Sequence, residues 1–178
     1  MSMQSITVAI ADANCERQAR LERSLQSEEG ISVLADIASD ANEISVNRRI
    51  KSRSKISTIE NAVARIRRLS PRILLANLNQ SLDADCSLLA SLRRECPETL
   101  VVLLADEPVR EEQLMQVMIN GARGYLDQKA TPPNLSKAIH MVDRGEAWVP
   151  RRMLGEIMDE VLNWCHGSSA EASLDSAC

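Results

Sequence analysis

Short apolar runs alternate with longer amphipathic stretches along most of the chain. Each run holds mostly Ile, Val, Leu and Ala and is bounded by polar residues, which is typical of a strand buried on both faces. Gly121-Ala122-Arg123-Gly124 is expected to form a turn before the last strand. The expected strands are residues 5–11, 31–37, 73–78, 100–104 and a short one at 125–126.

The stretches between these strands carry apolar residues at intervals of three and four, the spacing of a helix with one buried face. The first is expected to turn Ala19, Leu21 and Leu25 inward, with either Asp12 or Asn14 as its cap. The expected helices are residues 14–26, 59–69, 85–96, 111–120 and 131–142.

Strand and helix alternate five times, and each connection between strands is long enough to hold a helix. Such crossovers imply parallel pairing, hence an α/β fold with a doubly wound open sheet covered by helices on both faces. In sheets of this kind, ligands and chemistry sit at the carboxyl ends of the strands. The positions to inspect are therefore residues 12–14, 77–85, 105–108 and 127–129.

The composition of the 178 residues narrows the class of protein further. The five cysteines are scattered without a CxxC pair, so neither a disulfide framework nor a metal site is expected. No stretch reaches the roughly 20 apolar residues of a membrane helix, and the start of the chain lacks the pattern of a signal peptide. We therefore expect a cytoplasmic protein with no membrane partner.

Three segments at or near the strand ends carry a family resemblance: residues 8–14 (VAIADAN), 71–79 (PRILLANLN) and 120–126 (NGARGYL). Together they resemble the receiver domains of bacterial two-component response regulators, in the NarL/FixJ or LuxR-type branch. The resemblance covers about residues 6–150, apart from a basic insert at about 39–57. It implies the flavodoxin-like fold, a five-stranded parallel sheet in the order 2-1-3-4-5, and a place in a phosphorelay.

An active receiver of this family uses two acids that hold Mg²⁺, an acceptor Asp, a Ser or Thr, and a Lys, all at strand ends. The five corresponding positions of this chain are Asp12, Ala13, Asn77, Ala105 and Gln128, which has Lys129 as its neighbour. The fourth position falls on Asp106 instead if the alignment gap is placed one residue later.

Tyr125 stands where the family has a movable aromatic, and without a phosphoryl-sensing hydroxyl it is expected to serve packing.

Asn77 stands where the family has the acceptor Asp, so it bears directly on whether the chain can be phosphorylated. An amide nitrogen is not a nucleophile and cannot carry a phosphoryl ester, and the lone carboxylate of Asp12 is a poor Mg²⁺ site. We expect a pseudo-receiver with no catalytic residue, no cofactor and weak or absent Mg²⁺ binding. Asp12 is then expected to act as a helix cap, and Asp83 and Asp85 as a solvated loop residue and a helix cap rather than displaced acceptors.

The insert between strand and helix is polar and basic and shows no apolar period, so we expect a long loop or a frayed helix at residues 38–57. A solvated loop is the favoured interpretation, with nucleic-acid phosphates or an acidic partner as the alternatives. The contact patch in those alternatives is formed by Arg48, Arg49, Lys51, Arg53 and Lys55.

After Trp148, Pro150 opens another helix with an apolar stripe formed by Leu154, Ile157, Met158, Val161 and Leu162. The stripe is expected either to pair with a second copy in a constitutive homodimer or to pack on the receiver. The expected organisation is a receiver-like domain at 1–149, a linker helix at 150–165 and a flexible tail at 166–178 that leads to a helix-turn-helix domain outside this chain.

Two classes of function remain. The first is a phosphorylation-independent signalling and dimerisation module of a LuxR-type transcriptional regulator, which reaches DNA through the further domain, or a stand-alone pseudo-receiver that binds a small-molecule effector or a protein partner. The second, a nucleotide-binding enzyme on the same fold, is weaker because no GxGxxG follows the first strand and no GxxxxGK[ST] occurs. We therefore expect a protein that is not an enzyme.

Overall fold

The computed structural model describes residues 5–12, 14–34, 53–78, 86–107, 109–127, 131–151, 153–159 and 162. The chain divides into two compact units, residues 1–148 and 149–178, and each is considered by itself. No helix in the described ranges is long and apolar enough to cross a membrane.

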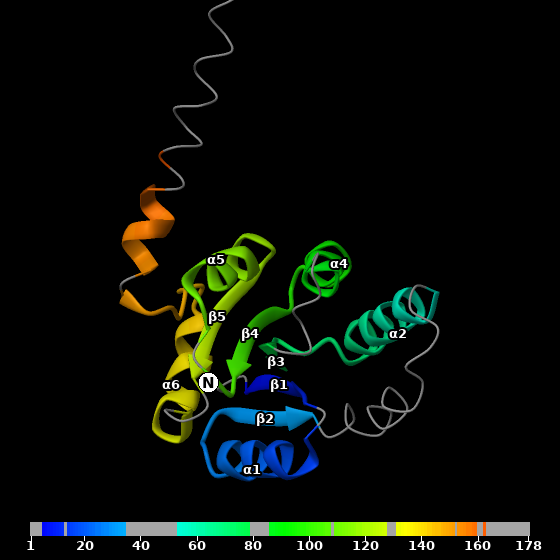
Figure 1. Cartoon of the computed structure of the whole chain (residues 1–178). Coiled ribbons are helices and arrows are strands. Elements are labelled where there is room, and N and C mark those ends of the chain that lie inside the picture. Colours follow the sequence, from blue (N-terminus) through cyan, green and yellow to red (C-terminus); the bar gives the residue numbers. More distant parts are fainter. Residues whose placement is uncertain are drawn as a thin grey trace, which may run out of the picture. The chain divides into compact units, whose positions relative to one another are not determined.

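The first unit is built on one five-stranded sheet in the order β2-β1-β3-β4-β5, with every neighbouring pair parallel (Figure 1). This confirms the predicted doubly wound α/β fold and its strand order. All residues of the central strand β3 are buried, as the apolar run before its last residue, Asn77, predicts. The strands are β1 (Ile6–Ala11), β2 (Ile31–Leu34), β3 (Ile73–Asn77), β4 (Leu100–Ala105) and β5 (Ala122–Asp127).

Helices cover both faces of this sheet, with α1 and α6 on one side and α2, α4 and α5 on the other (Figure 1). The core between the sheet and the first pair includes Leu21 and Leu25 of α1 and Leu135, Ile139 and Val142 of α6. The helices are α1 (Cys15–Gln26), α2 (Arg53–Leu69), α4 (Ser87–Glu95), α5 (Glu111–Ile119) and α6 (Thr131–Asp143).

The turn predicted at residues 121–124 is confirmed at Gly121 but wrong for residues 122–124, because β5 already begins at Ala122. Val101 pairs with Ala122 and Val102 pairs with Gly124, so Arg123 is an extra residue in a bulge. A Cβ on Gly124 would lie 3.2 Å from the Cβ of Trp148. Glycine is therefore needed here for the close approach of another chain segment within a strand, and its presence was misread as a turn signal.

Two helices also differ from their predicted form. Of the two alternatives for the basic insert, a loop or a frayed helix, the loop is wrong for residues 53–57, which form the start of α2. Arg and Lys are good helix formers, so a helix that packing stabilises at its far end extends readily through them. In α1, Ala19 is exposed and Gln18 is buried beside Leu21 and Leu25, which shifts the inward face by one residue.

In the second unit, the described residues 151, 153–159 and 162 are helical. Leu154, Met158 and Leu162 are all about half-exposed or more there, and Ile157 is partly buried. Val161 lies outside the described residues. The predicted apolar stripe thus lies on a helix, and its pairing with a second copy stays a prediction.

Candidate functional site

Three strand ends meet at the carboxyl edge of the sheet and bring together residues that are far apart in the sequence. Ala11 is paired with Ala76, so Asp12 and Asn77 each continue from paired positions on β1 and β3. Asn77 is in turn paired with Leu104, which places Ala105 and Asp106 just beyond it on β4. Asp12, Asn77 and the end of β4 are therefore neighbours, as the strand-end rule predicts.

Asp12 is the most enclosed acid of this site, with 1% of its side chain exposed. Its Oδ1 accepts a hydrogen bond from the backbone N–H of Asn14 at 2.8 Å. Arg17 donates to the same carboxylate twice, from Nε to Oδ2 and from Nη2 to Oδ1, the latter at 2.5 Å. A planar guanidinium fork thus closes on both carboxylate oxygens, which is the geometry that arginine matches best.

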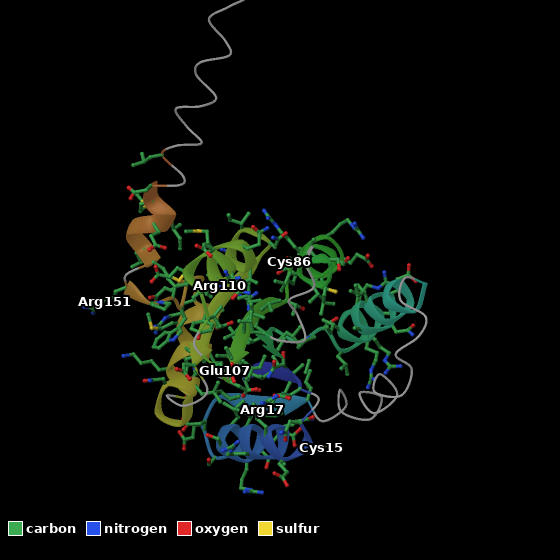
Figure 2. The ribbon with its side chains drawn as sticks, in the orientation of Figure 1. Cys15, Arg17, Cys86, Glu107, Arg110 and Arg151 are labelled. Carbon is green, nitrogen blue, oxygen red and sulfur yellow. The ribbon has the colours of Figure 1, made fainter. Side chains whose placement is uncertain are left out.

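Arg17 also reaches the neighbouring strand. Its Nη1 lies 2.5 Å from Oδ2 of Asp106, so all three guanidinium nitrogens donate to carboxylates. In Figure 2 the residue lies on α1 near the end of β4, where Glu107 is labelled. The hydrogen bond to Asp12 raises the pKa of Arg17, against the opposing effect of burial. The group therefore remains a cation at any pH at which the protein is handled.

The start of α1 explains why Arg17 can reach this position. Asn14 is the N-cap and accepts a hydrogen bond from the backbone N–H of Arg17 at 3.0 Å. Long side chains in a helix point back toward its N-terminus, so an arginine in the first turn is directed toward the end of β1. The expectation that Asp12 caps the helix is wrong: Asn14 is the cap, and Asp12 binds Arg17.

Asn77, which the family resemblance puts at the position of the phosphoryl acceptor, is 2% exposed. Its Nδ2 donates a long hydrogen bond of 3.5 Å to Oδ2 of Asp106. Ala105, one of the two residues that the resemblance puts at the hydroxyl position, is buried and offers a methyl group. The site therefore holds two carboxylates, one guanidinium and one amide, and both carboxylates are bound to the guanidinium of Arg17.

Mg²⁺, the ion that the family resemblance implies, does not fit this set of donors. Both oxygens of Asp12 and Oδ2 of Asp106 already accept hydrogen bonds from Arg17. A metal ion would need those same oxygens and would lie beside a fixed positive charge. Within the described ranges, no group of three or more His, Cys, Asp or Glu could hold a metal ion.

Other predicted site residues lie on β5 and α2. Tyr125 is partly buried on β5, where its backbone N–H donates to the carbonyl of Trp148 at 2.8 Å. Arg53 and Lys55 lie in α2, and their side chains are not described. The predicted positions outside the described residues are Ala13, Gln128, Lys129, Asp83, Asp85, Arg48, Arg49 and Lys51.

Sequence reasoning missed Arg17, although one signal for it was present. The first turn of a helix favours acidic side chains because the helix dipole is positive there. An arginine at that place, five residues after a strand-end aspartate, therefore indicates a compensating acid nearby. Asp106 entered the prediction as an alternative to Ala105 at the hydroxyl position, and its role as a second partner of the arginine was not foreseen.

No family model matches the chain. Among curated proteins, it is 27% identical over 107 residues to the oxygen regulatory protein NreC of Staphylococcus haemolyticus, an alignment that covers 58% of this chain and 48% of the relative. The NreC of Staphylococcus aureus is 28% identical over 116 residues, which cover 63% of this chain and 52% of the relative. The chain thus spans about half the length of the curated relatives it matches.

Solved structures agree on the fold. The isolated receiver domain of RcsB from Salmonella enterica serovar Typhimurium superposes with a TM-score of 0.64 at 16% identity, covering 87% of this chain and 99% of that one. A LuxR family DNA-binding response regulator from Silicibacter pomeroyi superposes with a TM-score of 0.58 at 20% identity, covering 82% of this chain and 98% of that one. Strand order and structural neighbours show that the chain has the fold of response-regulator receiver domains, and its sequence is similar to part of the NreC relatives.

Proposed function

We propose that this receiver domain works without aspartyl phosphorylation, as a signalling and dimerisation module of a LuxR-type transcriptional regulator. The observation that carries the proposal is Asn77, which lies at the acceptor position at the end of β3 and is buried. The carboxamide nitrogen has its lone pair delocalised into the carbonyl, so it does not attack a phosphorus atom. A phosphoryl group transferred to this position would have no acceptor oxygen of carboxylate strength.

The neighbouring positions support the same conclusion. Ala105 offers no hydroxyl to a bound phosphoryl group. Asp12 and Asp106 bind Arg17 in place of a metal ion. Phosphoryl transfer depends on positioned cations and donors around the moving group, and the described residues supply them in a different arrangement.

The relatives suggest how such a module is used. One structural neighbour is described as a DNA-binding response regulator of the LuxR family, and this chain spans about half the length of its NreC relatives. We infer that a DNA-binding domain lies elsewhere in the full protein, that the protein acts in the cytoplasm, and that a partner protein or a small-molecule effector replaces phosphorylation as the input.

The test of phosphorylation uses the whole chain with Mg²⁺ and acetyl phosphate, followed by intact-protein mass spectrometry at neutral pH. We expect no phosphoryl adduct under conditions in which an active receiver domain, run as the control, is labelled. We also expect no Mg²⁺-dependent rise in melting temperature with beryllofluoride. A phosphoryl adduct on an aspartate of this chain, or such a rise, would contradict the proposal.

The dimer is tested separately by sedimentation. Replacing Leu154 and Met158, both exposed on the second-unit helix, by glutamate should convert a dimer into a monomer. Replacing the exposed Glu156 of the same helix by glutamine serves as the control and should leave the dimer intact. A wild-type chain that remains monomeric at high concentration would defeat this part of the proposal.

A further inference from the structure

The two acids at the carboxyl edge of the sheet face a cation that belongs to the same chain. Asp12 and Asp106 come from the ends of β1 and β4, two strands separated by β3, and the guanidinium of Arg17 lies between their carboxylates. The side chain of Arg17 is 13% exposed, against 1% for Asp12 and 37% for Asp106. The cluster is therefore closed at Asp12 and open to solvent at Asp106.

Burial makes a partner for Asp12 necessary. A carboxylate removed from water loses several kcal/mol of hydration unless a charge and hydrogen bonds replace it. The fork of Arg17 and the backbone N–H of Asn14 supply three hydrogen bonds and one positive charge. A bound divalent cation would satisfy the same need, and the arginine already does so without any ligand.

The neutral amide of Asn77 suits a site in which two carboxylates share one guanidinium. Its amide donates toward Asp106, which an ionised carboxylate in its place could not do. A carboxylate there would also add a third negative charge to a site that holds one cation. Asn77 and Arg17 therefore act as one set, in which the amide replaces an acid and the guanidinium replaces a metal ion.

We propose that Arg17 is a built-in cation that takes the place of a divalent metal in this pocket, and that the pocket binds a divalent metal only when the side chain of Arg17 is removed. The proposal deepens the proposed function and rests on it, because a receiver that transfers no phosphoryl group has no use for an exchangeable ion. The competing group is attached to the chain, so it competes with free metal at a high local concentration.

The experiment measures Mn²⁺ binding to the whole chain by electron paramagnetic resonance, which reports the free ion. Arg17→Met removes the charge and keeps the apolar stem. The control Arg20→Met removes the same charge from an exposed position of the same helix. We expect the Arg17 variant to bind Mn²⁺ at least about tenfold more tightly than wild type, because a fixed like charge has left the site. The control should match the wild type.

The double variant Arg17→Met/Asp12→Asn assigns the ion to the pocket, and the tight binding should be lost in it. Arg17→Gln keeps a donor for Asp12 without the charge, and it provides the same measurement should the methionine variant not fold. Wild-type binding as tight as that of the Arg17 variants would overturn the proposal, as would variants that fold and bind no more Mn²⁺ than wild type.

The two proposals fail in different ways. A wild-type chain that takes up no phosphoryl group but binds Mn²⁺ through Asp12 would overturn the built-in cation alone. A wild-type chain that is phosphorylated while its pocket excludes Mn²⁺ would overturn the phosphorylation-independent function alone.

Discussion

One arginine lies at the carboxyl ends of the strands and another at their amino ends, and the two differ in their surroundings. Arg17 lies at the carboxyl edge, where all three guanidinium nitrogens contact two acids. Arg72 lies at the amino edge, where it donates to the side chain and carbonyl of Asp143 at 2.8 and 3.1 Å and to the carbonyl of Glu98 at 3.4 Å. The side chain of Arg72 is 40% exposed, against 13% for Arg17.

Both arginines join elements that are distant in the sequence, so connection alone does not distinguish them. Arg72 joins the start of β3 to the end of α6 through hydrogen bonds. Because its side chain is in contact with water, water can replace these bonds. Arg17 neutralises a carboxylate that water does not reach. We therefore expect the same residue type to contribute little to stability where solvent competes, and much where its removal would leave a charge buried alone.

The largest expected effect follows from removing the enclosed cation. Arg17→Met should lower the free energy of unfolding by about 3 kcal/mol, because it leaves the carboxylate of Asp12 buried without a countercharge. Urea denaturation measures the change. Arg20→Met, on the exposed side of α1, should stay within about 0.5 kcal/mol of wild type. Equal losses in the two variants would show that Asp12 does not depend on Arg17.

The next effect comes from restoring an acid at the acceptor position. Asn77→Asp should cost about 1–2 kcal/mol at neutral pH, because the new carboxylate lies beside Asp106. The negative charge of Asp106 raises the folded-state pKa of the new carboxyl above its unfolded value. The loss of stability should therefore be small at about pH 4 or below and grow as the pH rises toward about 7.

A double variant separates repulsion from mere change of shape at this position. In an Asp106→Asn background, the cost of Asn77→Asp should shrink and lose most of its pH dependence. A cost that is the same in both backgrounds, measured by urea denaturation at each pH, would rule out repulsion by Asp106.

Removing the arginine at the amino ends of the strands should lower the free energy of unfolding by less. Arg72→Ala is expected to lower the free energy of unfolding by about 1 kcal/mol, since solvent screens its bonds to Asp143. The control Arg94→Ala removes an arginine whose side chain is 74% exposed and paired with the adjacent Glu95, and should change stability less. A loss at Arg72 as large as that at Arg17 would mean that exposure does not set the difference between the two edges.

The smallest effect is a difference in salt dependence. Raising the NaCl concentration from about 0.05 to 0.5 M should reduce the cost of Arg72→Ala by more than it reduces the cost of Arg17→Met, because screening acts mainly on exposed charges. Thermal unfolding at both salt concentrations, compared with wild type, gives the two costs. Equal salt dependence would indicate that water reaches both clusters alike.

Much of the fold could be predicted because its signals are local. The apolar runs at β1, β3 and β4 and the helical spacing of α6 specify buried strands and an inward helix face independently of the rest of the chain. β5 was shortened because Gly124 resembles a turn residue in the sequence. Only the approach of Trp148 in the folded state explains why a strand needs glycine at that position.

The site was predictable to the same extent. Asp12, Asn77 and Ala105 were brought together by the rule that parallel strands end at one edge. Arg17 escaped prediction because its role depends on the direction of one long side chain and on the cap at Asn14. Asp106 was ambiguous because its assignment depends on a one-residue choice in the loop after β4.

The bridge between Trp148 and β5 has a consequence for how other chains can approach the domain. The N–H of Tyr125 and the carbonyl of Arg123 are already bound to the backbone of Trp148, at 2.8 and 3.0 Å. These are groups on the outer edge of the sheet, which would otherwise be available as a template for an incoming strand. A partner that recognised β5 by strand addition at these positions would first have to displace Trp148.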